Sequence, residues 1–131
     1  MKTVYTKNAP EPIGPYSQAV LADNILFVSG QIALKDGELQ NESIETETKQ
    51  VLCNLEAILK QASFSVEDIA KVTIYLTDIQ LFSKVNKIYE EFLKGHKPAR
   101  ETVEVSALPL GAKIEISLIA VKNNSTESKE D

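Results

Sequence analysis

The stretch that decides the fold is Lys97–Val121, with the sequence KPARETVEVSALPLGAKIEISLIAV. Its apolar residues predict two strands, roughly Arg100–Val105 and Ala112–Val121, joined by a turn that contains a proline and a glycine. Arg100 is the only arginine in the chain, and the planar fork of arginine binds a carboxylate or phosphate in a way that lysine cannot. Glu115 lies within an otherwise apolar strand. Both residues are therefore candidates for a functional site, although solvated surface charges would fit the same pattern.

Composition limits the class of protein. A length of 131 residues predicts a single domain, and a hydrophobic content of 43% is ordinary for a globular protein. The net charge of −5 and the absence of a basic cluster argue against nucleic acid as a partner. No apolar run is long enough to span a membrane, no signal-peptide pattern is visible, and one cysteine suits a reducing compartment. We expect a cytoplasmic protein with one domain at residues 1–122 and a polar, disordered tail at 123–131.

Hydrophobic periodicity predicts the other elements. The expected strands are Thr3–Thr6, Tyr16–Leu21, Ile25–Gln31 and Lys71–Leu76, and the expected helices are Glu45–Ala62 and a second one from Asp78, its N-cap, to about Lys94. Gly30 suggests a bulge or a close backbone approach, and Lys35–Glu38 suggests a turn. With the two strands of the first stretch, the order is β-β-β-α-β-α-β-β. Two helices placed between strands require crossover connections. The pattern therefore predicts an α+β fold: a mixed six-stranded sheet with both helices packed on one face.

This architecture leaves one sheet face without a cover. Two helices cover only one side of such a sheet, yet Ile25–Val28 and Ile114–Val121 are apolar on both sides. The simplest cover for the second face is another copy of the chain. We therefore expect a homo-oligomer.

A small set of polar residues could carry chemistry. Its members are Tyr16, Ser29, Gly30, Asn86, Arg100, Thr102 and Glu115. An arginine that holds an anion, a carboxylate that takes a proton from water and hydroxyl groups that orient a ligand would suit hydrolysis of a small acidic molecule without a cofactor. Tyr16 has an alternative interpretation as an anchor of the loop before it.

The other reactive side chains are weaker candidates. The chain has one histidine and one cysteine, so it cannot form a His/Cys metal cluster, and we expect no metal site. Cys53 lies between Leu52 and Leu55 on the first predicted helix and is expected to be buried. His96 follows the glycine that ends the second predicted helix, so we interpret it as a helix-end or loop residue and not as a general base.

Four motifs connect the chain with a known family. They are IGPYSQAV at Ile13–Val20, VSGQI at Val28–Ile32, VNKIYEEF at Val85–Phe92, and PAR followed by LPLGAKIEISLIAV. The chain resembles the reactive-intermediate deaminase family, RidA/YjgF, over nearly its whole length. The resemblance implies a chorismate-mutase-like fold, assembled as a homotrimer with ligand clefts between subunits. It also implies hydrolysis of 2-enamine and 2-imine acids, such as 2-aminoacrylate and 2-iminopropanoate, to a 2-keto acid and ammonia, with no cofactor.

The resemblance also assigns roles to residues. Arg100 would bind the substrate carboxylate, and Glu115 would activate the attacking water. Tyr16, Ser29 and Gly30 would line the pocket, Gly30 through its backbone. Asn86 would shape the wall of the pocket or the subunit interface.

One departure from the family concerns the residues after the arginine. Relatives often have small residues or a cysteine there, whereas this chain has Glu101 and Thr102. Alternation along the strand predicts that Thr102 faces the same way as Arg100 and that Glu101 faces the opposite way. Other functions remain open on the same scaffold: a binding or regulatory protein for small carboxylic acids, or a translation inhibitor with ribonuclease activity.

Overall fold

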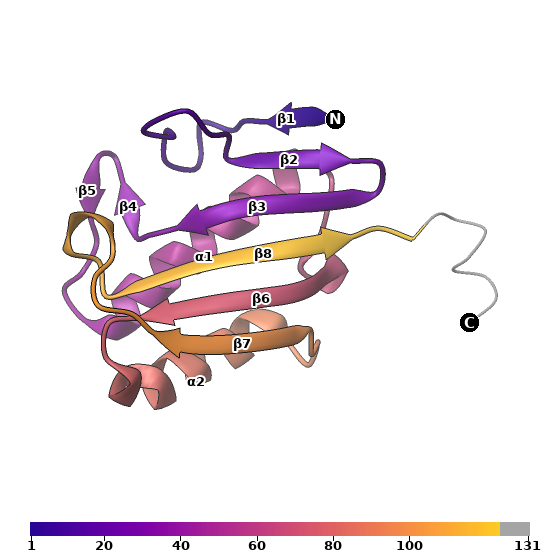
Figure 1. Cartoon of the computed structure of the whole chain (residues 1–131). Coiled ribbons are helices and arrows are strands. Elements are labelled where there is room, and N and C mark those ends of the chain that lie inside the picture. Colours follow the sequence, from indigo (N-terminus) through magenta and orange to yellow (C-terminus); the bar gives the residue numbers. More distant parts are fainter. Residues whose placement is uncertain (124–131) are drawn as a thin grey trace.

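A six-stranded sheet organises the chain, in the order β1-β2-β3-β8-β6-β7. The computed structural model describes residues 1–123; residues 124–131, which hold nearly all of the predicted tail, lie outside this range (Figure 1). The strands are β1 Lys2–Val4, β2 Ala19–Ala22, β3 Ile25–Gln31, β6 Ile69–Leu76, β7 Ala99–Glu104 and β8 Ile114–Val121. Only β6 and β7 pair in parallel, and the other neighbours are antiparallel. The predicted mixed sheet is confirmed.

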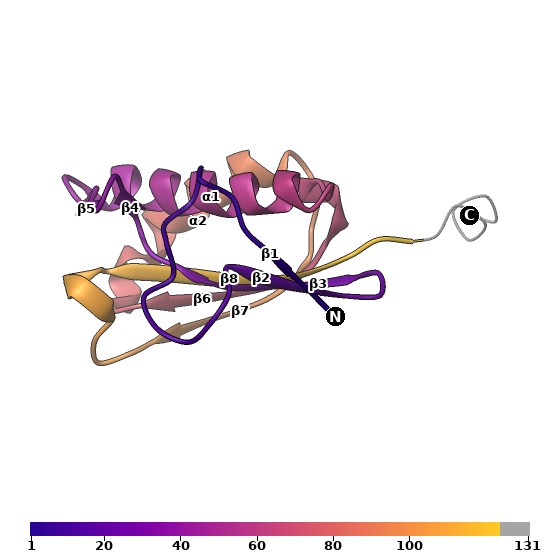
Figure 2. The same ribbon diagram turned by 90° about the horizontal axis from the view of Figure 1, so that it is seen from above.

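Both helices lie on one side of the sheet. They are α1, Ile44–Gln61, and α2, Phe82–Leu93, and Figure 2 shows them stacked on the same face. We call this side the helix face and the other side the open face. The crossovers β3-α1-β6 and β6-α2-β7 place the helices together, because each helix must pack back onto the sheet that it connects. Among the described residues, no helix is both long and apolar enough to cross a membrane.

The core lies between the helix face and the two helices. Alternate residues of β8, beginning with Ile114 and Ile116, are fully buried, as are Ile74 of β6 and Leu26 of β3. They pack with the stripe of α1 that includes Val51, Leu55, Ile58 and Leu59. This packing fixes the side of the sheet on which each remaining strand residue lies.

The first helix begins where its sequence predicts, and Ser43 caps it by accepting a hydrogen bond from the Thr46 N–H at 3.0 Å. The prediction that Cys53 is buried is wrong, because this side chain is exposed. Position 53 is two residues after Val51 and two before Leu55, so it points away from the apolar stripe of α1.

Two local features add detail to the prediction. The turn predicted at Lys35–Glu38 is confirmed, and it is the tip of a small hairpin between β4, Leu34–Lys35, and β5, Glu38–Leu39. Asp78 does not cap α2 directly. It accepts a hydrogen bond from the Gln80 N–H and caps a short 3-10 turn that leads into the helix.

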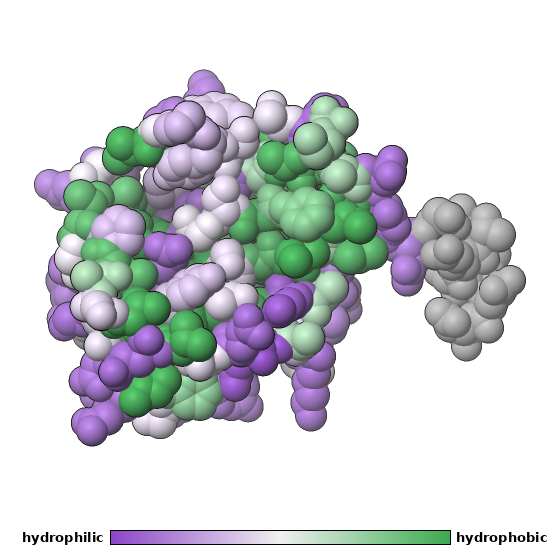
Figure 3. Space-filling view, viewed as in Figure 1, coloured by the Kyte–Doolittle hydropathy of each residue, from purple (hydrophilic) through white to green (hydrophobic). Residues whose placement is uncertain are grey.

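The open face carries an apolar patch near the β2–β3 turn. Its members are Val20, Ala22, Ile25, Phe27, Ile119 and Val121, which the pairing register aligns across three neighbouring strands. Phe27 at the centre is 45% exposed. Figure 3 shows the patch as a green area on this face. We call it the open-face patch. Contiguous exposed apolar residues of this kind often mark a contact with another protein surface.

A buried amide organises the loop between β1 and β2. Gln18 is 1% exposed, and its Oε1 accepts a hydrogen bond from the Thr6 N–H at 2.7 Å. Its Nε2 donates to the carbonyl oxygens of Thr6, Ala9 and Pro10 at 3.0–3.3 Å. One side chain therefore replaces the backbone pairing that this proline-rich segment cannot make, and it holds the loop that carries Tyr16.

We predict that Gln18→Leu lowers the free energy of unfolding by about 2–4 kcal/mol, because it leaves several buried backbone groups without partners. Chemical denaturation at fixed protein concentration measures the change. The control is Gln80→Leu at an exposed position, which should change stability by less than about 0.5 kcal/mol. Equal stability of Gln18→Leu and wild type would refute the role of this amide.

Candidate active site

Arg100 lies on edge strand β7 and points toward α2. Its Nη1 donates a hydrogen bond to Oδ1 of Asn86 at 2.7 Å. Its guanidinium carbon lies 5.0 Å from the ring centre of Phe82 and 5.1 Å from that of Tyr89. Residues 82, 86 and 89 form one stripe of α2, so a single helix face orients the guanidinium by one hydrogen bond and two cation–π contacts.

The amide of Asn86 is itself held in place. Its Nδ2 donates to Oε1 of Glu90, one turn further along α2, at 3.0 Å. This contact directs the amide oxygen toward Arg100, because an amide has one donating and one accepting end. Glu90, Asn86 and Arg100 therefore form a short chain of hydrogen bonds.

The guanidinium remains available for an anion. Within the described residues, it makes one hydrogen bond and no salt bridge, so most of its N–H groups are free to bind a ligand. Glu101 does not compete with a ligand for it, since Glu101 lies on the open face and pairs with Lys71 at 3.6 Å. Arg100, Asn86 and Tyr89 line a cavity of about 560 Å³. The predicted opposite orientations of Arg100 and Glu101 are confirmed.

Two hydroxyl groups near Arg100 lack a partner. Tyr89 Oη and Thr102 Oγ1 are buried and make no hydrogen bond within the described chain. Thr102 faces the same side of β7 as Arg100, as predicted. Burial raises the pKa of Tyr89 above its ordinary value, although the positive charge of Arg100 offsets part of the rise. The side chain of Arg100 itself is exposed, so its guanidinium is accessible to an anion from solvent.

Glu115 lies on the open face, between residues of β8 that are buried on the helix face. Its carboxylate packs directly on Gly30. A Cβ at position 30 would lie 2.8 Å from Cδ of Glu115 and closer still to Oε2, so no other residue fits there without movement. The register of β3 against β8 shifts between Val28 and Gln31. The predicted bulge or close backbone approach at Gly30 is confirmed, and it gives the carboxylate its place.

The surroundings of Glu115 suit a proton acceptor. Burial raises the pKa of its carboxyl group above the ordinary value. The group lines a cavity of about 510 Å³ together with Tyr16, Ser29 and Gly30. Tyr16 accepts a hydrogen bond from the Ile13 N–H at 3.3 Å and is 52% exposed, so it both anchors its loop and faces the cavity. Ser29 Oγ donates to the Ser17 carbonyl at 2.6 Å.

The predicted site residues form two separate groups in one chain. Arg100, Asn86 and Thr102 belong to the helix face, whereas Glu115, Tyr16, Ser29 and Gly30 belong to the open face and its loops. We call them the arginine half-site and the glutamate half-site. A ligand that binds both Arg100 and Glu115 would therefore need more than one copy of the chain.

Sequence reasoning missed several supporting residues. Phe82, Tyr89 and Glu90 were predicted only as helix residues, although their spacing with Asn86 along α2 could have indicated a common face. Glu47 is fully buried on α1 and accepts a hydrogen bond from the Lys113 N–H at 2.7 Å, which fixes the chain just before β8. No sequence pattern indicated this contact. His96 also lines the cavity of Arg100, and its Nε2 lies 2.7 Å from the Ile69 carbonyl oxygen.

Comparison with known proteins decides the family. The sequence profile of a family described as endoribonuclease L-PSP matches residues 6–122. A RutC family protein from Pyrococcus horikoshii is 50% identical over 123 residues, which cover 92% of this chain and 98% of that protein. The chain belongs to the RidA/YjgF family. The human 2-iminobutanoate/2-iminopropanoate deaminase is 41% identical over 127 residues, which cover 95% of this chain and 93% of the human protein.

Solved structures of the RidA/YjgF family share the fold. The YjgF gene product from E. coli matches with a TM-score of 0.89 and 41% identity, covering 94% of this chain and all of that one. The chorismate-mutase-like α+β architecture expected from the resemblance is thereby confirmed. Within the described residues, no cluster of three His, Cys, Asp or Glu side chains could hold a metal ion.

The raised pKa of Glu115 predicts a pH-dependent effect on stability. The folded state binds this proton more tightly than the unfolded state does, so an ionised Glu115 destabilises the fold above its unfolded pKa. Glu115→Gln should therefore raise the free energy of unfolding at pH 7, and the gain should vanish as the pH falls to about 4. Denaturant titrations of both proteins at several pH values test this. A gain in the free energy of unfolding that is the same at pH 7 and at about pH 4 would contradict a raised pKa of Glu115.

Proposed function

We propose that this chain hydrolyses 2-enamine and 2-imine acids, converting 2-aminoacrylate and its tautomer 2-iminopropanoate to pyruvate and ammonia. The proposal rests on two groups that the same chain carries, each in its own cavity. Arg100 has free N–H groups, and Glu115 is a half-buried carboxyl group of raised pKa. The arginine binds a carboxylate, and the carboxyl group of raised pKa is a stronger base than an ordinary carboxylate. The names of the human and rat relatives as imine deaminases support the same reaction.

The two half-sites combine when chains associate. We propose a homotrimer in which the arginine half-site of one subunit meets the glutamate half-site of its neighbour. Association would cover the open-face patch, including Phe27, which is 45% exposed in the single chain. In a closed ring of three subunits the same contact occurs three times, so every subunit has its half-sites completed in the same way. The substrate would bind in the cleft between subunits, where water is partly excluded and charge interactions are stronger.

The reaction follows from these positions. Arg100 holds the carboxylate of the protonated imine through two parallel hydrogen bonds, assisted by Asn86, which fixes the guanidinium. Glu115 takes a proton from water as the water oxygen bonds to the imine carbon. The resulting 2-amino-2-hydroxy acid receives that proton on its nitrogen. Ammonia leaves as Glu115 takes the proton of the hydroxyl group, which becomes the keto oxygen, and Glu115 then passes that proton to ammonia. The protonated imine and water thus give the 2-keto acid and ammonium, and atoms and charges balance without a cofactor.

The remaining site residues bind and orient the substrate. Tyr16 presents its ring and hydroxyl to the cavity of Glu115, and Ser29 holds the Ser17 backbone beneath it. Gly30 leaves room for the carboxylate of Glu115. Thr102 provides an unpartnered hydroxyl near Arg100.

Two other functions fit less well. A protein that only binds small carboxylic acids would need Arg100 but would gain nothing from a half-buried carboxylate of raised pKa. A ribonuclease, the activity named in the family description, would be favoured by a basic surface for phosphates, whereas the net charge is −5. The single histidine of this chain, His96, also has its Nε2 hydrogen-bonded to the Ile69 carbonyl.

Two variants should separate binding from chemistry. Arg100→Lys keeps the charge but loses the planar fork, so it should bind pyruvate poorly and lower kcat/KM by about 30- to 1000-fold. Glu115→Gln keeps nearly the same shape but is a far weaker base. It should bind pyruvate nearly as well as wild type while lowering kcat. The measurements are steady-state hydrolysis of enzymatically generated 2-iminopropanoate and calorimetric titration with pyruvate.

Lys113→Arg, at an exposed position that lines neither cavity, is the matched control for a change of cation. It should leave both measurements unchanged. Wild-type rates of hydrolysis in Arg100→Lys would show that Arg100 does not bind the substrate. A wild-type protein that binds pyruvate without hydrolysing any imine would support the binding function instead.

A further inference from the structure

Glu47 places a carboxyl group on the apolar face of α1. The residue is 0% exposed, and it lies one turn before Val51 and two turns before Leu55, which are both core residues. Its Oε2 accepts the hydrogen bond from the Lys113 N–H at 2.7 Å, and its Oε1 is buried without a partner in the described chain. A carboxyl group is rarely buried completely, because it loses its hydrogen bonds to water. An apolar residue would suit this position better for stability alone, so Glu47 is expected to serve another purpose.

Lys113 is held from two sides. Its N–H group is bound by Glu47 of α1, and its carbonyl oxygen accepts a hydrogen bond from the Thr77 N–H, just after β6, at 3.1 Å. Lys113 is the last residue before β8, and Glu115 follows two positions later. The two bonds therefore fix the point at which the chain enters the strand that carries Glu115.

The ladder restrains Glu115 from one side only. On the β6 side, Glu115 pairs with Tyr75. On the other side, β3 ends at Gln31, which pairs with Ile116, so no residue of β3 in the described chain pairs with Glu115. The position of the Glu115 carboxyl group against β3 therefore depends strongly on what holds the beginning of β8.

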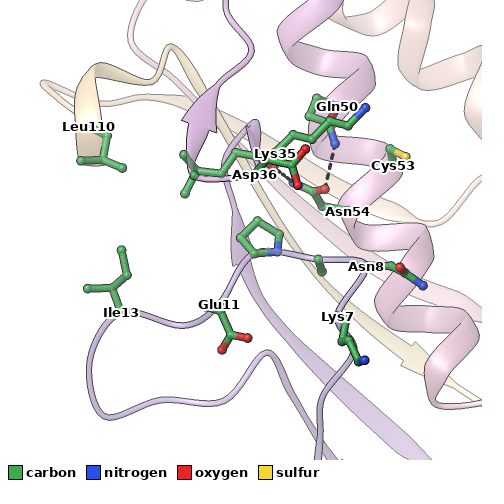
Figure 4. A pocket seen from close by; sticks show the side chains of 14 residues that line it. Lys7, Asn8, Glu11, Ile13, Lys35, Asp36, Gln50, Cys53, Asn54 and Leu110 are labelled. Atoms are coloured by element: carbon green, nitrogen blue, oxygen red, sulfur yellow. Dashed lines mark hydrogen bonds between the residues drawn. The ribbon is translucent and has the colours of Figure 1, made fainter.

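Helix α1 also holds the end of β3. Asn54 is 2% exposed, and its Nδ2 donates to the carbonyl oxygens of Ile32 and Leu34 at 3.1 and 3.0 Å. Figure 4 shows this amide beside Gln50, whose Nε2 donates to Asn54 Oδ1 at 2.9 Å. Glu47 and Asn54 are seven residues apart, so they lie two turns apart on the same side of the helix. α1 is therefore the common support of β3 and β8 at the glutamate half-site.

We propose that Glu47 is a positioning residue for the deamination: through the Lys113 N–H, it holds Glu115 in the place against Gly30 from which the proton is taken. The inference rests on the proposed function and adds to it a residue that does not touch the substrate. Its contacts lie inside one subunit, between α1 and the start of β8. Glu47 therefore acts on the rate of the chemical step and not on binding of the substrate carboxylate, which belongs to Arg100.

The first test is Glu47→Met, which removes the acceptor and fills the space with an apolar side chain of similar length. A displacement of about 1 Å can lower a rate about 100-fold, so kcat for enzymatically generated 2-iminopropanoate should fall about 10- to 100-fold. The Kd for pyruvate, measured by calorimetry, should stay within about twofold of wild type, because the arginine half-site is unchanged. Hydrogen exchange of the Lys113 N–H should become faster, which reports the lost bond directly.

Glu47→Gln is the conservative variant. Its side-chain oxygen can still accept from the Lys113 N–H, and its NH2 group replaces an oxygen that already has no partner in the described chain. Its kcat should therefore lie within about twofold of wild type. The matched control is Glu45→Met, which removes the other acidic residue from the first turn of α1 and leaves Lys113 bound. It should change neither kcat nor the Kd for pyruvate.

Lys113→Pro breaks the same hydrogen bond from its other end, because proline has no N–H group. Ala112 before it has φ −61° and ψ 148°, a conformation that suits the residue before a proline. This variant provides the measurement if Glu47→Met does not fold. Because both changes remove one bond, the double variant should have a kcat no lower than that of the slower single variant.

The remaining outcomes separate the two proposals. A wild-type protein that does not hydrolyse the imine refutes the proposed function itself. With an active wild type, a wild-type kcat in Glu47→Met, or a Glu47→Gln variant as slow as Glu47→Met, overturns only the role of Glu47. Loss of pyruvate affinity or of assembly together with kcat would show that Glu47 merely supports the fold, and losses that multiply in the double variant would show that the bond to Lys113 is not the cause.

Discussion

A six-stranded sheet with only two helices has one face that the chain cannot cover, and the rest of the structure depends on this constraint. α1 and α2 bury one side of the sheet, while Phe27 and its apolar neighbours remain on the other. The same division separates the reactive residues. Arg100 points to the helix face and Glu115 to the open face, so their chemistry can combine only if chains associate. The proposed assembly and the proposed catalysis therefore stand or fall together.

Each half-site is prepared before a ligand binds. One stripe of α2 orients the guanidinium of Arg100 through Phe82, Asn86 and Tyr89, which reduces the conformational freedom that binding must remove. The carboxylate of Glu115 rests against Gly30, and burial raises its pKa. Under the proposed function, such preparation would suit a short-lived imine, which leaves little time for rearrangement before it reacts elsewhere.

The fold could be predicted from the sequence because hydrophobic periodicity marks each major strand and helix. The special status of Arg100 and the close approach at Gly30 were also visible, one as the only arginine and the other as a glycine at a strand end. The separation of Arg100 and Glu115 onto opposite faces was not recognised, since it depends on the register of β7 against β6. Cys53 was misplaced because its neighbours in sequence are buried, although the helical angle turns it outward. The contacts of Glu47 and Gln18 join distant segments and leave no local pattern.

The most direct test of the central claim is a mixing experiment with Arg100→Lys and Glu115→Gln. We expect each variant alone to be nearly inactive on 2-iminopropanoate. The two are unfolded together in equal amounts, refolded and assayed. If each site takes Arg100 from one subunit and Glu115 from its neighbour, about a quarter of the sites regain both wild-type groups by random assembly, and activity returns to about a quarter of wild type. Activity that stays at the level of the separate variants would show that both groups act within one chain.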